Sequence, residues 1–165
     1  MSDVSYNPGY FPALFGATGT GLPLLGGLIR ASELRSGRID HALALAIPKA
    51  KAGQFVWPAQ RSDGWGTGPD AIPEGTRLRI DPRLDLSTLG LPPIGLAIAR
   101  AAQRYGMVIR DQAGAVTFYA EDPVTLKTNP YWALHAGKYP NDILASFPWS
   151  HLQVVLAPAR PRRAG

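Results

Sequence analysis

The chain has 165 residues, 45% of them hydrophobic and 18% charged, a balance that excludes a disordered protein and suffices for one domain with its own core. It contains no cysteine, which excludes thiol catalysis, cysteine-ligated zinc and disulfide bonds. The net charge of +5 does not indicate nucleic-acid binding, because Arg160, Arg162 and Arg163 lie in the C-terminal tail and no basic helix occurs.

Neither a signal peptide nor a membrane span is indicated by the sequence. Residues 1–4 contain no basic region followed by an apolar core, and the longest apolar stretches are interrupted by glycine or proline. The 18 glycines and 16 prolines punctuate the chain every few residues. Such a chain has short elements and many turns, which favours a β-rich architecture.

The first third of the chain leads into one well-patterned strand. Residues 1–22 form an aromatic, glycine-containing loop, in which no Gly-Lys-Ser/Thr follows to support a phosphate-binding loop. Residues 23–30 are apolar and must be buried, although two glycines argue against a helix. A short helical turn capped by Ser32 and ended by Gly37 follows.

Residues 38–48 are the best candidate for the central strand, because bulky and small residues alternate strictly. Leu43, Leu45 and Ile47 share one face with His41, and the opposite face carries only alanines. A strand of this kind lies inside a sheet and is covered closely on its alanine face.

The middle of the chain predicts two further strands around a long loop. Residues 54–58 are expected to return beside the central strand, with Pro58 at the end or edge, and residues 76–80 alternate arginine with apolar residues. Between them, residues 59–73 form a polar, glycine-rich loop with an exposed Trp65. Loops of this length inside compact domains are often functional.

The last part of the chain contains the clearest helix, at residues 93–105, where an apolar stripe repeats at helical spacing. The segments that follow are a hairpin of residues 107–111 and 115–120, a short helix capped by Asn141 and a strand at 151–156. We therefore expect a β-rich α+β fold, a two-layer sandwich or open barrel of about six strands with helix 93–105 across one face. Residues 1–156 form a single domain, and residues 157–165 form a disordered basic tail.

Five blocks carry a resemblance to a known family: GLPLLGGLIR (21–30), GRIDHAL (37–43), WPA (57–59), PEGTRLR (73–79) and YGMVIRD (105–111). In this order they resemble a family of uncharacterised bacterial proteins, frequent in actinobacteria, over residues 5–156. Members of that family are longer and often exported. The resemblance implies that this chain is the C-terminal part of such a protein, that Met1 is an internal methionine and that an extracellular location is to be expected. An incomplete N-terminus would also leave a face open to a partner chain or a second copy.

His41 is the first candidate catalytic residue. At the head of a central strand, a histidine serves as a general base when a carboxylate orients it, and Asp63 or Asp111 could do so. The alternative is a buried histidine that bonds to the main chain.

The segment from Trp57 to Trp65 is the candidate ligand-binding block. Trp57, Arg61 and Trp65 combine flat aromatic faces with a hydrogen-bonding cation, which is what a sugar ring requires. The alternative is a loop held by one buried tryptophan.

The available carboxylates, Asp63, Asp111, Glu121 and Asp122, are not paired by any spacing typical of a glycosidase. Three histidines spread along the chain do not indicate a transition-metal site, and no cofactor motif occurs. Two functions remain open, and the sequence does not decide whether the protein is an enzyme. One is a carbohydrate-binding or carbohydrate-active hydrolase domain of the cell surface with a polysaccharide as partner. The other is a non-catalytic structural or interaction domain, part of a larger fold or assembly.

Overall fold

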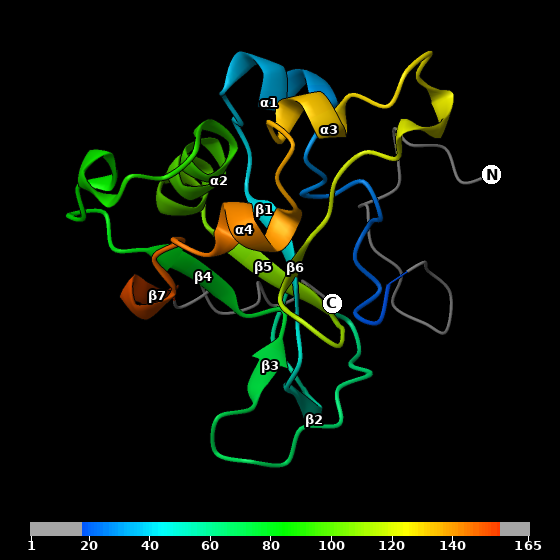
Figure 1. The fold of residues 1–165 in the computed structure, drawn as a ribbon. Coiled ribbons are helices and arrows are strands. Elements are labelled where there is room, and N and C mark those ends of the chain that lie inside the picture. The colour runs from blue at the N-terminus through cyan, green and yellow to red at the C-terminus, as the bar shows by residue number, and fades with distance from the viewer. Residues whose placement is uncertain (1–17, 156–165) are drawn as a thin grey trace, which may run out of the picture.

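The computed structural model describes residues 18–155, which form a five-stranded sheet, a two-stranded sheet and four α-helices (Figure 1). The predicted tail 157–165 and most of the loop 1–22 lie outside the described residues. The strands are β1 (Leu43–Ile47), β2 (Ala50–Phe55), β3 (Ile72–Glu74), β4 (Arg77–Ile80), β5 (Met107–Gln112), β6 (Thr117–Phe118) and β7 (Leu152–Val155). The helices are α1 (Ala31–Ser36), α2 (Pro93–Arg104), α3 (Tyr131–Leu134) and α4 (Pro140–Leu144), with 3-10 turns at Leu86–Leu89, Pro123–Thr125 and Trp149–His151.

The larger sheet has the order β6-β1-β5-β4-β7. Its centre is the parallel pair of β1 and β5, and the pairs β6–β1, β5–β4 and β4–β7 are antiparallel. All five residues of β1 are buried. The predicted position of this strand inside the sheet is therefore confirmed.

The two faces of β1 differ as the alternation predicts. Leu45 is paired with Phe118, which lines a cavity with Ile94 of α2, so the leucine face lies toward the helices. On the other face, Gly27 adopts a φ of +79° and accepts a hydrogen bond from the main-chain amide of Ala44. A Cβ on Gly27 would lie 2.4 Å from that amide nitrogen. The alanines thus make room for a main-chain segment that only glycine can supply.

Two strand pairings differ from the predictions. The segments 107–111 and 115–120 were expected to pair as a hairpin, but β6 pairs with β1, because β1 and β4 occupy both edges of β5. The segment predicted at 54–58 was expected beside the central strand. Strand β2 instead begins at Ala50 and pairs with β3 in the separate sheet. Local alternation identifies a strand but does not determine its neighbour.

The predicted helix 93–105 is confirmed as α2, which packs across the sheet against β4. The α+β class is also confirmed, but the expected β-rich character is wrong, because helical and strand residues are present in similar amounts. The short helix α1 begins at Ala31 rather than after a Ser32 cap and ends at Gly37 with a φ of +67°, as predicted. Helix α4 begins at Pro140 with Tyr139 as its N-cap, so Asn141, the expected cap, lies inside the helix. Within residues 18–155, every helix is too short or too polar to span a bilayer.

Candidate functional site

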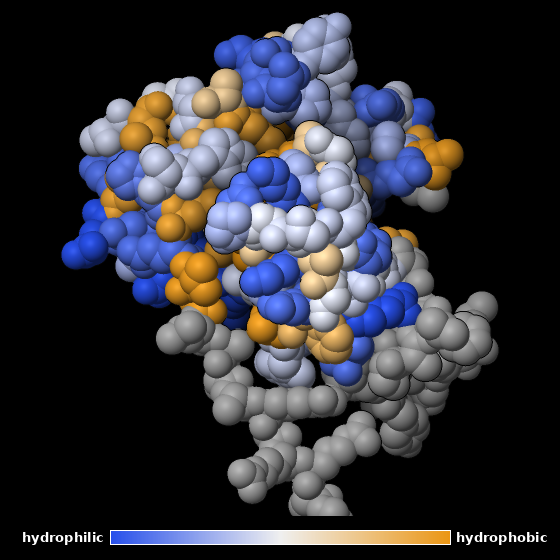
Figure 2. Space-filling model, turned by 90° about the horizontal axis from the view of Figure 1, so that it is seen from below, coloured by the Kyte–Doolittle hydropathy of each residue, from blue (hydrophilic) through white to orange (hydrophobic). Residues whose placement is uncertain are grey.

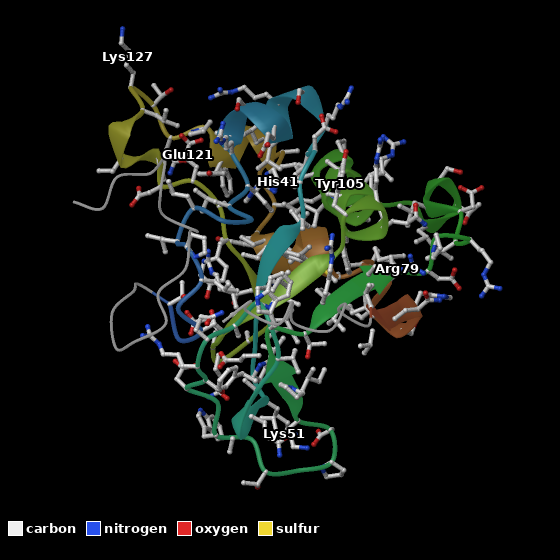
Figure 3. All side chains as sticks on the ribbon, turned by 180° about the vertical axis from the view of Figure 1, so that it is seen from behind. His41, Lys51, Arg79, Tyr105, Glu121 and Lys127 are labelled. Carbon is white, nitrogen blue, oxygen red and sulfur yellow. The ribbon has the colours of Figure 1, made fainter. Side chains whose placement is uncertain are left out.

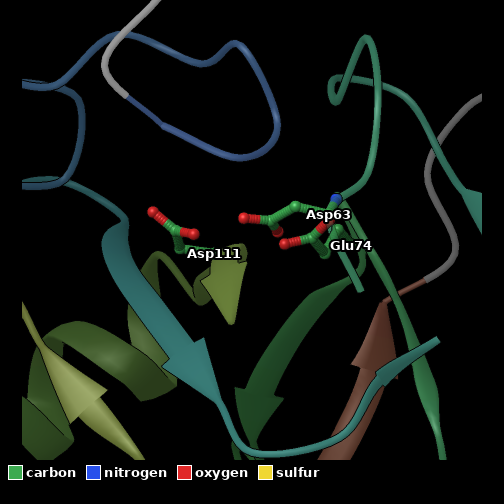
Figure 4. Close-up of side chains that lie close together, drawn as sticks. All are labelled: Asp63, Glu74 and Asp111. Carbon is green, nitrogen blue, oxygen red and sulfur yellow. The ribbon is translucent and has the colours of Figure 1, made fainter. Parts of the chain in front are cut away.

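Three carboxylates from separate segments meet where the two sheets adjoin (Figure 4). Asp63 belongs to the loop between β2 and β3, Glu74 ends β3 and Asp111 lies near the end of β5. Each contributes a carboxylate oxygen, and these oxygens lie within 4.8 Å of one another. We call these three residues the carboxylate cluster.

Glu74 forms the buried floor of the cluster, with no exposed surface. Its main chain is fixed on both sides: its carbonyl accepts a hydrogen bond from the amide of Val56, and the next amide, of Gly75, donates to Ile109. Gly75 has a φ of +86°, and a Cβ there would collide with the carbonyl of Val56. The position of the Glu74 carboxyl is therefore set by the contact between the two sheets.

The Glu74 carboxyl is only half satisfied. Its Oε2 accepts a hydrogen bond of 3.1 Å from the amide of Asp63. Its Oε1 is buried and has no hydrogen-bond partner among residues 18–155. Burial raises the pKa of Glu74 to about 7, against a lowering by the Ser62 hydroxyl and with a further rise from the charge of Asp63.

Asp111 and Asp63 form the more accessible side of the cluster. Burial raises the pKa of Asp111, the Asp63 charge adds to this rise, and the amide of Gly19 opposes it. Asp63 is exposed. A β-bulge between the Leu45 and Ala46 pairings shifts the register, so that Asp111 lies opposite Ala46. This shift brings Asp111 to the end of the sheet where β3 arrives.

The segment around Gly19 covers the cluster. A Cβ on Gly19 would lie 2.3 Å from a carboxylate oxygen of Asp63, so the main chain passes directly beside that group. The guanidinium of Arg61 donates to the carbonyls of Gly19 at 3.0 Å and Thr18 at 2.8 Å. The hydroxyl of Thr20 donates to the carbonyl of Arg110 at 2.7 Å. These bonds hold the segment over the cluster.

The structure brings Asp63 and Asp111 together but separates His41 from both. His41 contacts Glu33 at 3.2 Å through Nε2 and the carbonyl of Ala42 at 2.9 Å through Nδ1. His41 precedes the start of β1 (Figure 3). Asp111 belongs to β5 and is paired with Ala46, near the other end of β1. The hypothesis that Asp63 or Asp111 orients His41 is therefore wrong, because the strand itself keeps them apart.

The predicted ligand-binding residues have three different environments. The guanidinium of Arg61 donates hydrogen bonds to the main chain of the covering segment. Trp57 is 38% exposed and lies just beyond β2, while Trp65 is 71% exposed and follows Asp63 in the same loop. Of the two tryptophans, Trp65 is the more exposed, and it lies two residues after Asp63 of the cluster.

Glu74 is the residue that sequence reasoning missed, because Glu74-Gly75 has the composition of an ordinary turn. The only local signal is an acidic residue between Pro73 and the glycine that ends the segment. Arg110 was missed as well: it is buried, donates to the carbonyl of Leu24 at 2.6 Å and lies 3.8 Å from the ring centre of Tyr119. It fixes the segment 23–27 to the sheet.

Carboxylate oxygens are the ligands that hard divalent cations prefer. The cluster offers one such oxygen from each of three segments, and Oε1 of Glu74 is buried without a hydrogen-bond partner among residues 18–155. A buried polar atom without a partner normally requires an explanation, and a bound cation would provide one. The arrangement can therefore hold a divalent cation such as Mg²⁺ or Mn²⁺.

Comparison with known proteins gives one partial similarity. No family model and no solved structure matches the chain. A dITP/XTP pyrophosphatase of Rhodopseudomonas palustris (strain ATCC BAA-98 / CGA009) is 31% identical over 83 residues, which are 46% of this chain. The chain spans about 40% of the length of that relative.

This similarity corrects one expectation from the sequence. The expectation of a carbohydrate-binding, β-rich protein is corrected, because the matched relative is named as a dITP/XTP pyrophosphatase and helices and strands are present in similar amounts. An extracellular location stays an expectation from the sequence. The chain is thus similar over 46% of its length to a hydrolase that acts on nucleotides.

Proposed function

We propose that this protein hydrolyses a phosphoanhydride bond with a divalent cation bound by Asp63, Glu74 and Asp111. The observation that carries this proposal is the buried carboxyl of Glu74, whose Oε1 has no partner within residues 18–155 and which belongs to a cluster with two other carboxylates. A carboxyl in this position either remains protonated or binds a cation.

The charge of the cluster suits a cation and a phosphate together. Three carboxylates would repel an anionic substrate, and a divalent cation neutralises part of this charge, binds phosphate oxygens and lowers the pKa of a bound water. Glu74 would bind from the buried floor, and Asp63 and Asp111 from the accessible side. The exposed position of Asp63 leaves a route for substrate and water.

The covering segment supports this arrangement. The Gly19 main chain lies against the Asp63 carboxylate without a side chain between them, and Arg61 holds its carbonyl. The carboxylates themselves accept from main-chain amides: Oε2 of Glu74 accepts from Asp63, and Asp111 accepts from Gln112 at 3.0 Å and from Gly19.

The name of the similar protein supports the reaction class. The R. palustris relative is a dITP/XTP pyrophosphatase, an enzyme that cleaves a phosphoanhydride bond. Because the similarity covers 46% of this chain and 40% of that one, it supports the reaction class and not the whole activity of the relative.

The test measures cation binding and hydrolysis in the same preparations. Isothermal titration with Mn²⁺ is expected to give one site in the wild type, and Mg²⁺-dependent release of pyrophosphate from ITP is expected to stop on addition of EDTA. Glu74→Gln and Asp111→Asn should lose both, whereas Asp40→Asn, an exposed carboxylate paired with Arg38, should retain both.

Cation binding that survives Glu74→Gln would contradict the site. Cation binding without hydrolysis of any phosphoanhydride would contradict the enzymatic role and favour the non-catalytic domain that the sequence also allows.

A further inference from the structure

Trp65 has a supported main chain and an exposed side chain, a combination that indicates a contact with a ligand. Trp65 is 71% exposed, and no ring contact joins it to another aromatic side chain within residues 18–155. The indole of a tryptophan offers a flat apolar face together with a polar N–H, which suits it to contact with a ligand ring.

The main chain around Trp65 is held against β2. The amide of Gly66 donates to the carbonyl of Ala50 at 2.8 Å, and the amide of Ala52 donates to the carbonyl of Gly66 at 2.9 Å. A Cβ on Gly64 would lie 2.7 Å from the same carbonyl of Ala50. With a glycine pressed against β2 on each side, the side chain of Trp65 points away from that strand, because successive side chains alternate in an extended segment.

A second bond ties Trp65 to the strand that carries Asp111. The amide of Trp65 donates to Oε1 of Gln112 at 3.2 Å, and Gln112 is the residue after Asp111. Trp65 is also two residues from Asp63, a separation of roughly 7 Å in an extended chain. The indole therefore flanks the carboxylate cluster from a position fixed on two strands.

Seen from below, the molecule shows hydrophilic and hydrophobic residues intermixed (Figure 2). An exposed indole offers a flat face to one ring, and stacking of this kind is how proteins bind nucleobases without hydrogen-bond readout.

We infer that Trp65 stacks on the base of a nucleoside triphosphate whose phosphates are bound at the carboxylate cluster. The inference rests on the proposed function and names its substrate class, which is a nucleotide. A purine nucleotide is expected to bind better than a pyrimidine nucleotide, because the larger ring covers more of the indole. An inorganic polyphosphate has no flat ring to place there.

The test compares a substrate that has a base with one that lacks it. With Mg²⁺, the KM for ITP is expected to rise roughly 10-fold or more in Trp65→Ala, because loss of one aromatic ring weakens the binding of a stacked base by about this factor. In Trp65→Phe, which keeps an aromatic ring, the KM should remain within about twofold of the wild type. The hydrolysis of tripolyphosphate should be unchanged in Trp65→Ala. Trp132→Ala is the matched control, because Trp132 is 63% exposed and belongs to α3. An unchanged KM for ITP, or an equal loss with both substrates, would overturn the inference.

A binding measurement separates this inference from the reaction. Quenching of tryptophan fluorescence by ITP with Ca²⁺ should be present in the wild type and in Trp132→Ala and absent in Trp65→Ala. If the protein binds ITP through Trp65 but hydrolyses nothing, the stacking stands and the enzymatic proposal fails. If it hydrolyses ITP with Trp65→Ala unimpaired, the enzymatic proposal stands and the stacking fails. If it neither binds nor hydrolyses ITP, both fail.

Discussion

The main-chain amide of Asp63 donates a hydrogen bond to Oε2 of Glu74 at 3.1 Å, while Oε1 of the same carboxyl has no partner among residues 18–155. One amide satisfies half of a fully buried acid and brings a second carboxylate close to it. The pKa of Glu74 is consequently raised to about 7, chiefly by burial. This relationship determines how the protein should respond to pH, to cations and to substitution.

The first prediction concerns stability and pH in the absence of divalent cations. Glu74 has a pKa of about 7 in the folded chain, against 4.5 as its ordinary value, so the folded state binds more protons than the unfolded state between these limits. The free energy of unfolding should therefore decrease as the pH rises from about 4.5 to 7, by at most about 3 kcal/mol from this group.

Glu74→Gln should remove this pH dependence and raise the free energy of unfolding at pH 8 by about 1–2 kcal/mol. Urea melts at pH 5 and pH 8 in EDTA measure both effects. Glu121→Gln, which keeps the oxygen that accepts from the amide of Ala31, serves as the control. A destabilised Glu74→Gln variant at pH 8 would show that the ionised carboxylate is satisfied without a cation.

The second prediction concerns the segment over the cluster. In Gly19→Ala, the added methyl would meet the Asp63 carboxylate at 2.3–2.5 Å, so one of the two groups must move. Affinity for Mn²⁺, measured by calorimetry, should fall at least about 10-fold. Gly114→Ala is the matched control, since nothing lies within 4 Å of a Cβ at that glycine. Equal affinities in the two variants would mean that the segment does not position Asp63.

The third prediction concerns His41, which the structure places beside Glu33 rather than in the cluster. His41→Ala should leave Mg²⁺-dependent hydrolysis within about twofold of the wild type. Because the imidazole is about one-third exposed, loss of its contact with Glu33 should change the free energy of unfolding by less than about 1 kcal/mol. Activity assays and urea melts on the same preparation check both values, and a large loss of hydrolysis would return His41 to the list of catalytic residues.

The fourth prediction concerns Arg110, a buried guanidinium that donates to the carbonyls of Leu24 at 2.6 Å and Gly26 at 3.3 Å. Arg110→Met should cost about 2–4 kcal/mol of unfolding free energy, because these carbonyls lose a charged donor and the contact with the Tyr119 ring is lost. Tyr119→Phe keeps that ring and should cost less than about 1 kcal/mol. Denaturant melts of the two variants and the wild type measure both changes in the free energy of unfolding. If Arg110→Met were as stable as the wild type, Arg110 would not be what holds the segment 23–27.

Several features could be predicted from the sequence because they depend on local periodicity. The strict alternation of residues 41–47 predicts a strand that is covered on both faces, and β1 is buried along its whole length. The apolar stripe of residues 93–105 predicts α2 almost to its end at Arg104. The small alanine side chains predict a close contact, and Gly27 supplies it.

Strand pairing could not be predicted in the same way. Residues 107–111 and 115–120 have hairpin composition, yet β6 pairs with β1. The reason is a competition for edges between segments that are distant in sequence: β4 and β1 occupy the two edges of β5. Only the complete set of long-range contacts decides such a competition.

The same distinction between local pattern and long-range contact applies to the residues of the site. The sequence by itself determined that Asp63, Asp111 and Trp65 lie in segments with polar or turn-forming neighbours, where ligand-binding groups are common. Only the tertiary structure decided that Glu74 joins Asp63 and Asp111 and that His41 does not. Burial of a side chain and the distance between carboxylates depend on how β2 and β3 dock against β5, and no local pattern encodes that contact.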